Sequence, residues 1–269
     1  MLRRSAVYLE RAGCASPRVD AERLLAHALG LERIELYMQL DRPLISSELA
    51  AARSIVARRA KREPLQYILG RWGFRRLDLL VDQRALIPRP ETEILVERAL
   101  ALISGREAPR VLDVGTGSGA IALAIADEHP GSHVIGLDVS ADALALAAEN
   151  VARTALAVEL VRGDLRDGLP IGPFDLVVSN PPYVDPADEE LLDPEVRDWE
   201  PQVALFGTEL ATEIARQALT RVVPGGALAL EVDDRQATGV ADALRRLGFT
   251  AVRVTDDLAG RPRVVEGTV

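Results

Sequence analysis

The sequence has almost none of the residues that form disulfides or bind metals. Cys14 is its one cysteine in 269 residues, which excludes an internal disulfide and a cluster of thiolate ligands. His129 and His133 are four residues apart, but Pro130 and Gly131 between them argue against a shared helix face. We therefore expect no metal site.

Long apolar runs are also missing. No run approaches the ~18 to 20 residues that span a bilayer, and residues 1–10 carry charges in place of the apolar core of a secretory signal. Aromatic residues make up 4% of the chain, so a core drawn from its 48% apolar residues must be mainly aliphatic. We expect a cytoplasmic protein without a membrane partner.

An excess of positive charge is absent as well. The net charge of −9 argues against extended duplex DNA as the main partner, because phosphate contacts dominate such binding. The charge is uneven, since residues 1–64 carry 12 Lys+Arg against 8 Asp+Glu and the remainder carries 20 against 33. We therefore do not expect nucleic acid as the partner, whereas the basic first segment is a candidate for binding a protein.

The chain divides by pattern into three parts. Apolar residues recur at three- and four-residue spacing up to Pro64, which predicts a small helical domain over residues 1–64. Residues 65–90 are a predicted linker with a short β-hairpin, formed by Trp72–Phe74 and Leu77–Val81. The predicted helices of the first part are Leu2–Ala12, Ala21–Leu29, Ile34–Leu40 and Leu49–Ala60.

Strands and helices alternate over residues 91–269, which predicts an α/β fold with a doubly wound, mostly parallel sheet. The predicted strands are Arg110–Val114, His133–Asp138, Val158–Val161, Asp175–Ser179, Ala227–Val232, Ala251–Thr255 and Arg263–Glu266. The predicted helices are Glu91–Ser104, Gly119–Glu128, Ala141–Arg153, a segment after Tyr183, Glu209–Val222 and Asp234–Leu247. In such sheets ligands bind at the carboxyl ends of the strands.

A glycine-rich turn follows the first of these strands and predicts a nucleotide-type site. The turn consists of Gly115, Thr116, Gly117, Ser118 and Gly119. Its glycines allow a tight turn and a close approach of the backbone to a ligand. The alternative interpretation is a plain tight turn between strand and helix.

Three acidic residues accompany this turn. Asp138, at the end of the next strand, can accept hydrogen bonds from ribose hydroxyls, although it could instead cap the following helix, as could Ser140. Asp113 lies two residues before the turn, where a carboxylate suits a cationic ligand better than a pyrophosphate. Asp164, with Leu165 after it, follows a third strand, Val158–Val161, and can bind an adenine amino group.

A second loop, Asn180-Pro181-Pro182-Tyr183, has the chemistry needed to activate a planar nitrogen. An amide nitrogen is a poor nucleophile, so its N–H groups must be held by acceptors while charge builds on it. The Asn180 side-chain oxygen and the Pro181 carbonyl are such acceptors, and the two prolines stiffen the loop. Tyr183 offers a flat face for stacking. The alternative is a proline-rich turn in which Asn180 makes a local hydrogen bond.

The two loops together resemble the Rossmann-like methyltransferases, whose cofactor is S-adenosylmethionine. The resemblance covers Arg110 to the C-terminus and implies a seven-stranded sheet that ends in an antiparallel hairpin. It implies that the glycine-rich turn holds the methionine part, Asp138 the ribose, and Asp164 with Leu165 the adenine. The Asn-Pro-Pro-Tyr tetrad resembles that of enzymes that methylate exocyclic amino groups of nucleic acids or glutamine amides of proteins.

Nearly the whole chain resembles the bacterial peptide chain release factor glutamine methyltransferases. The resemblance rests on the helical segment 1–63, on Leu86–Glu93 with its Ile-Pro-Arg-Pro-Glu-Thr-Glu run, and on the stretch from Asp185 to Leu205. It implies methylation at N5 of the glutamine in the Gly-Gly-Gln loop of class 1 release factors, with Arg89 and Pro90 at the substrate. Alternative substrates are another protein glutamine, as in a ribosomal protein, or a nucleic acid base. A further alternative is a cofactor-binding module without catalysis.

The sequence departs from this family at two places, Asp233 and Gly207–Leu210. Neither departure is expected to touch the Asn180 loop, although both belong to the rim of the site. Asp185–Glu200 carries eight acids and one base. This stretch is either a solvated loop or a landing surface for a basic patch on the partner.

Overall fold

Apolar residues recur every three or four positions in the first part of the chain, and this part folds into short helices. The computed structural model describes residues 1–39 and 41–269, and Leu40, the last residue of one expected helix, lies outside them. A first compact unit consists of Met1–Arg71 together with Leu192–Trp199. Its helices are α1 Leu2–Arg11, α2 Pro17–Leu29, α3 Arg33–Met38, α4 Ser46–Ala60, α5 Leu65–Leu69 and α9 Pro194–Arg197.

Buried ion pairs hold the distant segment Leu192–Trp199 in this first unit. Arg59 donates to Asp20 at 2.8 Å, and both residues are buried. Arg59 also pairs with Glu195 at 2.8 Å, and Arg62 pairs with the same carboxylate. Because the charges are paired and hydrogen-bonded, α9 is anchored to the end of α4.

The second unit, Trp72–Leu191 with Glu200–Val269, is built on a seven-stranded sheet. Its order is β5-β4-β3-β6-β7-β9-β8, with β7 to β9 and β9 to β8 antiparallel and the other pairs parallel. The strands are β3 Arg110–Val114, β4 His133–Asp138, β5 Val158–Arg162, β6 Phe174–Ser179, β7 Val222–Glu231, β8 Thr250–Asp256 and β9 Pro262–Thr268. The predicted mostly parallel sheet with a terminal antiparallel pair is confirmed.

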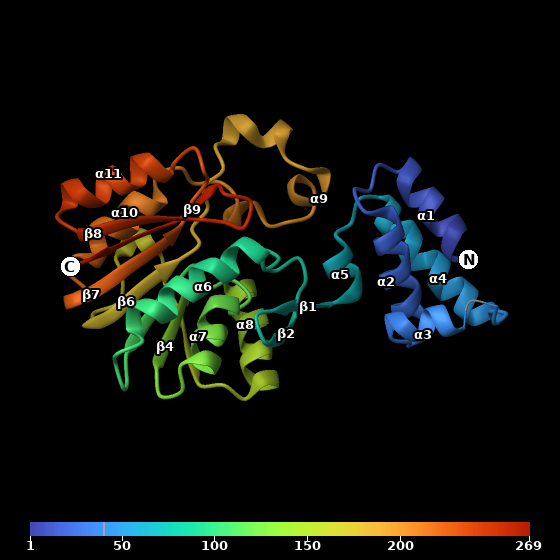
Figure 1. The fold of residues 1–269 in the computed structure, drawn as a ribbon, viewed down its shortest axis with the longest axis horizontal. Helices are drawn as coiled ribbons and strands as arrows, with labels where there is room; N and C mark the ends of the chain where they lie inside the picture. Colours follow the sequence, from blue (N-terminus) through green and yellow to red (C-terminus); the bar gives the residue numbers. More distant parts are fainter. Residues whose placement is uncertain (40) are drawn as a thin grey trace. The chain divides into compact units, whose positions relative to one another are not determined.

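Helices cover both faces of this sheet, as Figure 1 shows. The helices are α6 Pro90–Ile103, α7 Ala120–Glu128, α8 Ala141–Thr154, α10 Leu210–Ala218 and α11 Ala237–Leu247. Side chains alternate along each strand, so Val111 and Val178 join a core with α6 and α7, whereas Leu112 and Val177 join a core with α10 and α11. Two shorter strands, β1 Arg71–Phe74 and β2 Leu77–Leu80, pair with each other where the hairpin is predicted.

Two predicted boundaries are wrong near the fifth strand. The expected helix Glu209–Val222 ends at Ala218, and β7 begins at Val222. The reason is pairing with the neighbouring strand, since the N–H of Phe174 donates to the Arg221 backbone carbonyl at 2.8 Å and Val222 lies opposite Phe174.

The other helical predictions need smaller corrections. Helix α11 begins at Ala237 and not at Asp234, because Asp233 accepts the Arg235 N–H and closes a turn before the helix. The helical segment expected after Tyr183 is a 3-10 turn, Pro186–Leu191, followed by α9. Among the described residues, none of the helices has the length and apolar character needed to cross a membrane.

Candidate active site

A cavity of about 640 Å³ lies at the carboxyl ends of β3, β4 and β6. From β3 the chain passes to β4 and β5 on one side and then returns to β6 on the other. Such a reversal leaves a crevice where open α/β sheets bind ligands. The cavity is lined by residues 84–88, Thr92, 114–118, Ala120, Ile121, 137–140, Ala143, 163–166, 179–182, Pro201, Val203, Ala204, Phe206, Leu210, Glu213 and Ile214.

The glycine-rich turn forms part of the cavity lining and is fixed by the neighbouring strand. The N–H groups of Gly115 and Thr116 both donate to the Leu137 carbonyl, at 2.8 and 2.9 Å. Gly117 has a φ of 57°, a left-handed conformation that other residues adopt with strain. Gly115 to Ser118 line the cavity, whereas Gly119 lies behind it, where an added Cβ would be 3.3 Å from Leu123.

Asp138 faces the cavity and is held in place by two backbone groups. Its Oδ2 accepts the Gly117 N–H at 2.8 Å and its Oδ1 accepts the Ser140 N–H at 2.9 Å. Each oxygen keeps a second lone pair for a ligand. Ser140, not Asp138, is the N-cap of α8, because its Oγ accepts the Ala143 N–H.

Asp113 lies beneath the turn and does not line the cavity. Its side chain is fully buried, and the Thr116 hydroxyl donates to its Oδ2 at 2.6 Å. Burial raises the pKa of Asp113 to about 7. Asp113 is expected near a cationic ligand, directly or through water; since it does not line the cavity, it makes no direct contact there and supports the turn through Thr116.

Asp164 and Leu165 line the cavity after β5. Asp164 caps a short 3-10 turn by accepting the Arg166 N–H at 2.8 Å. The Arg166 guanidinium pairs with the same carboxylate at 2.6 Å and holds the pKa of Asp164 below its usual range. The acidic group expected near a base is therefore ionised and oriented.

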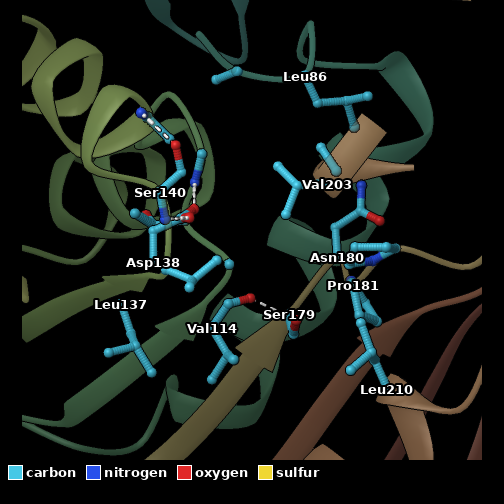
Figure 2. Close-up of a pocket in the computed structure, with 18 of the residues that line it drawn as sticks. Leu86, Val114, Leu137, Asp138, Ser140, Ser179, Asn180, Pro181, Val203 and Leu210 are labelled. Atoms are coloured by element: carbon cyan, nitrogen blue, oxygen red, sulfur yellow. Dashed lines mark hydrogen bonds between the residues drawn. The ribbon is translucent and has the colours of Figure 1, made fainter. Parts of the chain in front are cut away.

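The Asn180 loop stands across the cavity from Asp138 and Ser140, as Figure 2 shows. The Ser179 hydroxyl donates to the Val114 carbonyl at 2.6 Å and joins the ends of β6 and β3. Asn180, Pro181 and Pro182 line the cavity. The Asn180 Nδ2 donates to Thr92 Oγ1 at 3.2 Å, a contact 88 residues away that a local turn does not supply.

Tyr183 is not among the residues that line the cavity. Burial raises the pKa of its phenol to about 12, and its backbone carbonyl accepts a hydrogen bond from Gln236 Nε2 at 3.0 Å. Tyr183 is partly exposed, and its ring, expected to stack on the substrate, does not form part of the cavity lining.

Arg89 and Pro90 also stand outside the cavity lining, although the residues just before them form part of it. Pro90 begins α6, and Arg89 pairs with the buried Glu200. The other Glu200 oxygen accepts the Ile87 N–H at 3.3 Å. Burial raises the pKa of Glu200, and Arg89 opposes that rise.

One departure from the family pattern does touch the loop, contrary to expectation. The Gly207 N–H donates to the Val184 carbonyl at 3.3 Å. A Cβ added at Gly207 would lie 2.6 Å from Leu210 Cδ1 and 3.3 Å from Pro182 Cβ. A glycine at this position lets the rim pack against the second proline.

The acidic stretch from Asp185 to Glu200 is less free than its sequence indicates. Several of its acids pair with arginines of the chain, among them Asp188 with Arg235, Glu195 with Arg59 and Arg62, Asp198 with Arg197, and Glu200 with Arg89. The structure therefore leaves fewer carboxylates for a landing surface. No group of histidine, cysteine, aspartate and glutamate within residues 1–39 and 41–269 has the arrangement to hold a metal ion.

Several lining residues had no distinct signal in the sequence. Leu86, Val203 and Leu210 are apolar side chains from three separate segments, and Figure 2 shows them around the cavity. Pro201 and Val203 lie in a stretch noted only for family resemblance. Their role as cavity lining follows from the chain's path and not from a local pattern.

Comparison with known proteins identifies relatives for both units. The family model "PrmC N-terminal domain" matches residues 1–70, and "Methyltransferase small domain" matches residues 91–193. A release factor glutamine methyltransferase of Geobacter sulfurreducens is 45% identical, covering 97% of this chain and 93% of the relative. The enzyme of the same name from Deinococcus radiodurans is also 45% identical, with coverages of 98% and 96%.

Solved structures show the same fold at lower identity. A methyltransferase from Pyrococcus furiosus has a TM-score of 0.55 at 20% identity, covering 71% of this chain and 88% of that one. The hMettl16 catalytic domain has a TM-score of 0.59 at 18% identity, with coverages of 80% and 81%. At these identities the likeness supports the fold alone.

Proposed function

Because this chain belongs to the release factor glutamine methyltransferase family, we propose that it methylates a class 1 peptide chain release factor. The methyl group of S-adenosylmethionine is transferred to N5 of the glutamine in the Gly-Gly-Gln loop. One observation carries the proposal: the glycine-rich turn and the Asn180 loop line one cavity, and Figure 2 shows Asp138 and Asn180 on opposite sides of it. The partner is a translation factor, which makes the cytoplasm the place of the reaction.

The residues of the cavity fit the cofactor. About 640 Å³ is within the usual range for a site that holds a small molecule. Gly115 is exposed, and an added Cβ there would meet nothing within 4 Å, so a ligand can approach its backbone. We assign the methionine part to Gly115–Ser118, with Asn180 nearby, and the ribose to Asp138. The adenine lies near Asp164 and Leu165, and Asp113 and Gly119 support the turn from behind.

The Asn180 loop binds and orients the glutamine amide. The Asn180 oxygen and the Pro181 carbonyl accept its two N–H groups, and Pro182 contacts the amide. The cofactor supplies a methyl group already activated on a sulfonium. On transfer, S-adenosylhomocysteine would leave, and the amide nitrogen would gain positive charge and release one proton to solvent water. Two preorganised acceptors stabilise that charge, and rigid placement keeps nitrogen, methyl carbon and sulfur in line.

Arg89, Pro90 and Tyr183 act on the substrate indirectly. Arg89 holds Glu200, which binds the backbone at Ile87 and so shapes the wall formed by Leu86–Pro88. Tyr183 fixes the end of the loop through the hydrogen bond that its backbone carbonyl accepts from Gln236. Residues 1–64 form the docking domain for the body of the release factor, residues 65–90 connect it, and residues 91–269 form the methyltransferase domain.

The proposal is tested with labelled S-adenosylmethionine and three acceptors: an unmethylated release factor, a ribosomal protein and a DNA oligonucleotide. Label is expected in the release factor alone. A release factor whose Gly-Gly-Gln glutamine is replaced by asparagine is the matched control and is expected to take up none. Label in the oligonucleotide or the ribosomal protein, with none in the release factor, would refute the substrate assignment.

A further inference from the structure

The orientation of the Asn180 amide decides whether its loop can work. The amide carries an oxygen that accepts and an NH₂ group that donates, and a half-turn exchanges them. Only the oxygen can hold the N–H of a glutamine substrate. The Asn180 NH₂ group is engaged on the other side, since its Nδ2 donates to Thr92 Oγ1 at 3.2 Å.

A buried carboxyl stands behind Thr92. In the parallel pair of β6 and β7, Ser179 lies opposite Leu230, so Asn180 and Glu231 follow at adjoining strand ends. Helix α6, which contains Thr92, packs against both strands. Thr92 is 4% exposed and Glu231 is 1% exposed. The Thr92 hydroxyl lies close enough to the Glu231 carboxyl to lower its pKa as a hydrogen-bond donor would. Glu231 Oε2 has no hydrogen-bond partner.

The chemistry of the three groups fixes the direction of the chain of hydrogen bonds. An ionised carboxylate only accepts, so the single Thr92 hydrogen goes to Glu231. The Thr92 oxygen is then an acceptor, and only the Asn180 NH₂ group can satisfy it. The Asn180 oxygen must consequently point away from Thr92.

We propose that Glu231 and Thr92 are positioning residues that fix the Asn180 amide with its oxygen toward the substrate nitrogen. The proposal rests on the methyl transfer proposed above, and it assigns a role to two residues outside the Asn-Pro-Pro-Tyr loop. Glu231 does not line the cavity and acts through Thr92. Thr92 lines the cavity, but its hydroxyl accepts from Asn180 Nδ2, so its effect on methyl transfer passes through Asn180.

Protonation of Glu231 would reverse the donors and acceptors in the hydrogen bonds that link Asn180, Thr92 and Glu231. Burial raises the pKa of Glu231 to about 7. The charged groups around it are Arg263, Arg89 and Glu91, together with the Tyr183 phenol, and the two arginines oppose the rise. A protonated Glu231 donates to Thr92, whose hydrogen can then go to the Asn180 oxygen. The rate of methyl transfer should therefore fall as the pH drops through about 7.

The test compares wild type with Thr92→Val, Thr92→Ser and Glu231→Gln, and uses Thr154→Val as the matched control. Thr154 is a partly buried threonine whose hydroxyl bonds only backbone carbonyls of its own helix, α8. Losing one orienting hydrogen bond is expected to lower kcat of Thr92→Val about tenfold. For Glu231→Gln, which changes no residue of the cavity lining, cofactor Kd and KM for the release factor should change much less than kcat. Thr92→Ser keeps the hydroxyl and should restore kcat, and Thr154→Val should match wild type.

The pH dependence of the methylation rate distinguishes a positioning role of Glu231 from a purely structural one. Wild type should lose activity on the acid side with an apparent pKa near 7, and Glu231→Gln should lack this limb because its amide does not titrate in that range. A wild-type kcat in Thr92→Val, or an unchanged acid limb in Glu231→Gln, would overturn the proposal.

A measurement without substrate keeps the inference separate from the proposed function. In ¹⁵N-labelled wild type, the side-chain NH₂ signals of Asn180 should shift with pH about a midpoint near 7, and in Glu231→Gln they should not. Absence of that titration in wild type would sink the positioning role even in an active enzyme. A wild type that titrates but does not methylate release factor would instead contradict the proposed function.

Discussion

Removing the arginine of the Arg89–Glu200 pair should destabilise the protein and loosen one wall of the cavity. The Glu200 side chain is 1% exposed, and the Arg89 side chain keeps 29% of its surface exposed. Loss of one partner of a buried pair leaves an uncompensated charge, which costs about 3 to 5 kcal/mol. We expect about 3 kcal/mol for Arg89→Ala, at the lower end, because Arg89 is partly solvated.

The loss of unfolding free energy in Arg89→Ala should increase with pH. Burial raises the pKa of Glu200, and Arg89 lowers it, so removing Arg89 lets that pKa rise further. A carboxyl whose folded-state pKa is raised loses stability as the pH rises through that pKa. The Arg89→Ala deficit in unfolding free energy should therefore be larger at pH 8 than at pH 5.

Urea unfolding of wild type, Arg89→Ala and the double variant Arg89→Ala/Glu200→Gln measures this directly. The double variant carries no unpaired charge and should recover part of the loss at pH 8. Arg216→Ala is the matched control, because its pair with Glu213 is exposed, and exposed pairs contribute about 0 to 1 kcal/mol. Equal stability of Arg89→Ala and wild type at both pH values would refute the reasoning.

Four further predictions concern the cavity and the domains. Asn180→Ala should lower kcat about 100-fold, as expected when one preorganised hydrogen-bonding group is lost, with cofactor Kd nearly unchanged by calorimetry; retained kcat would contradict its role. Asp138→Ala should weaken cofactor binding by about 1.5 to 3 kcal/mol in the same assay, the usual contribution of hydrogen bonds to a charged group. The folded-state pKa of Asp113 is raised to about 7, so wild-type unfolding free energy should fall as pH rises from about 4 to 7; a fall of the same size in Asp113→Asn would count against this. A chain lacking residues 1–64 should still methylate a short Gly-Gly-Gln peptide but not intact release factor, as measured by methyl incorporation; full activity on the intact protein would exclude the docking role.

The sheet was predictable because its signals are local. Arg110–Val114 and His133–Asp138 form β3 and β4 with the predicted bounds, since each is a run of mainly apolar residues ended by a turn. The start of β7 was missed because Pro224, Gly225 and Gly226 are typical of a loop. Pairing with β6 outweighs that local preference.

The loops of the site could be predicted from the sequence, whereas the buried residues that hold these loops in place could not. The sequence places Asp138 and Asn180 at strand ends, and both line the cavity. It cannot show that Asp113 is buried beneath the turn, because the direction of a side chain depends on the packing of the sheet. Thr92 reaches Asn180 across 88 residues and Glu200 reaches Arg89 across 111, so these contacts follow from the fold alone.

The most direct test of the central claim is to map the methylated residue. Purified protein is incubated with S-adenosylmethionine and an unmethylated release factor, and the product is digested and analysed by peptide mass spectrometry. One added methyl group on the side chain of the Gly-Gly-Gln glutamine is the predicted result. A methyl group on any other residue, or none while calorimetry shows that the cofactor binds, would contradict the account.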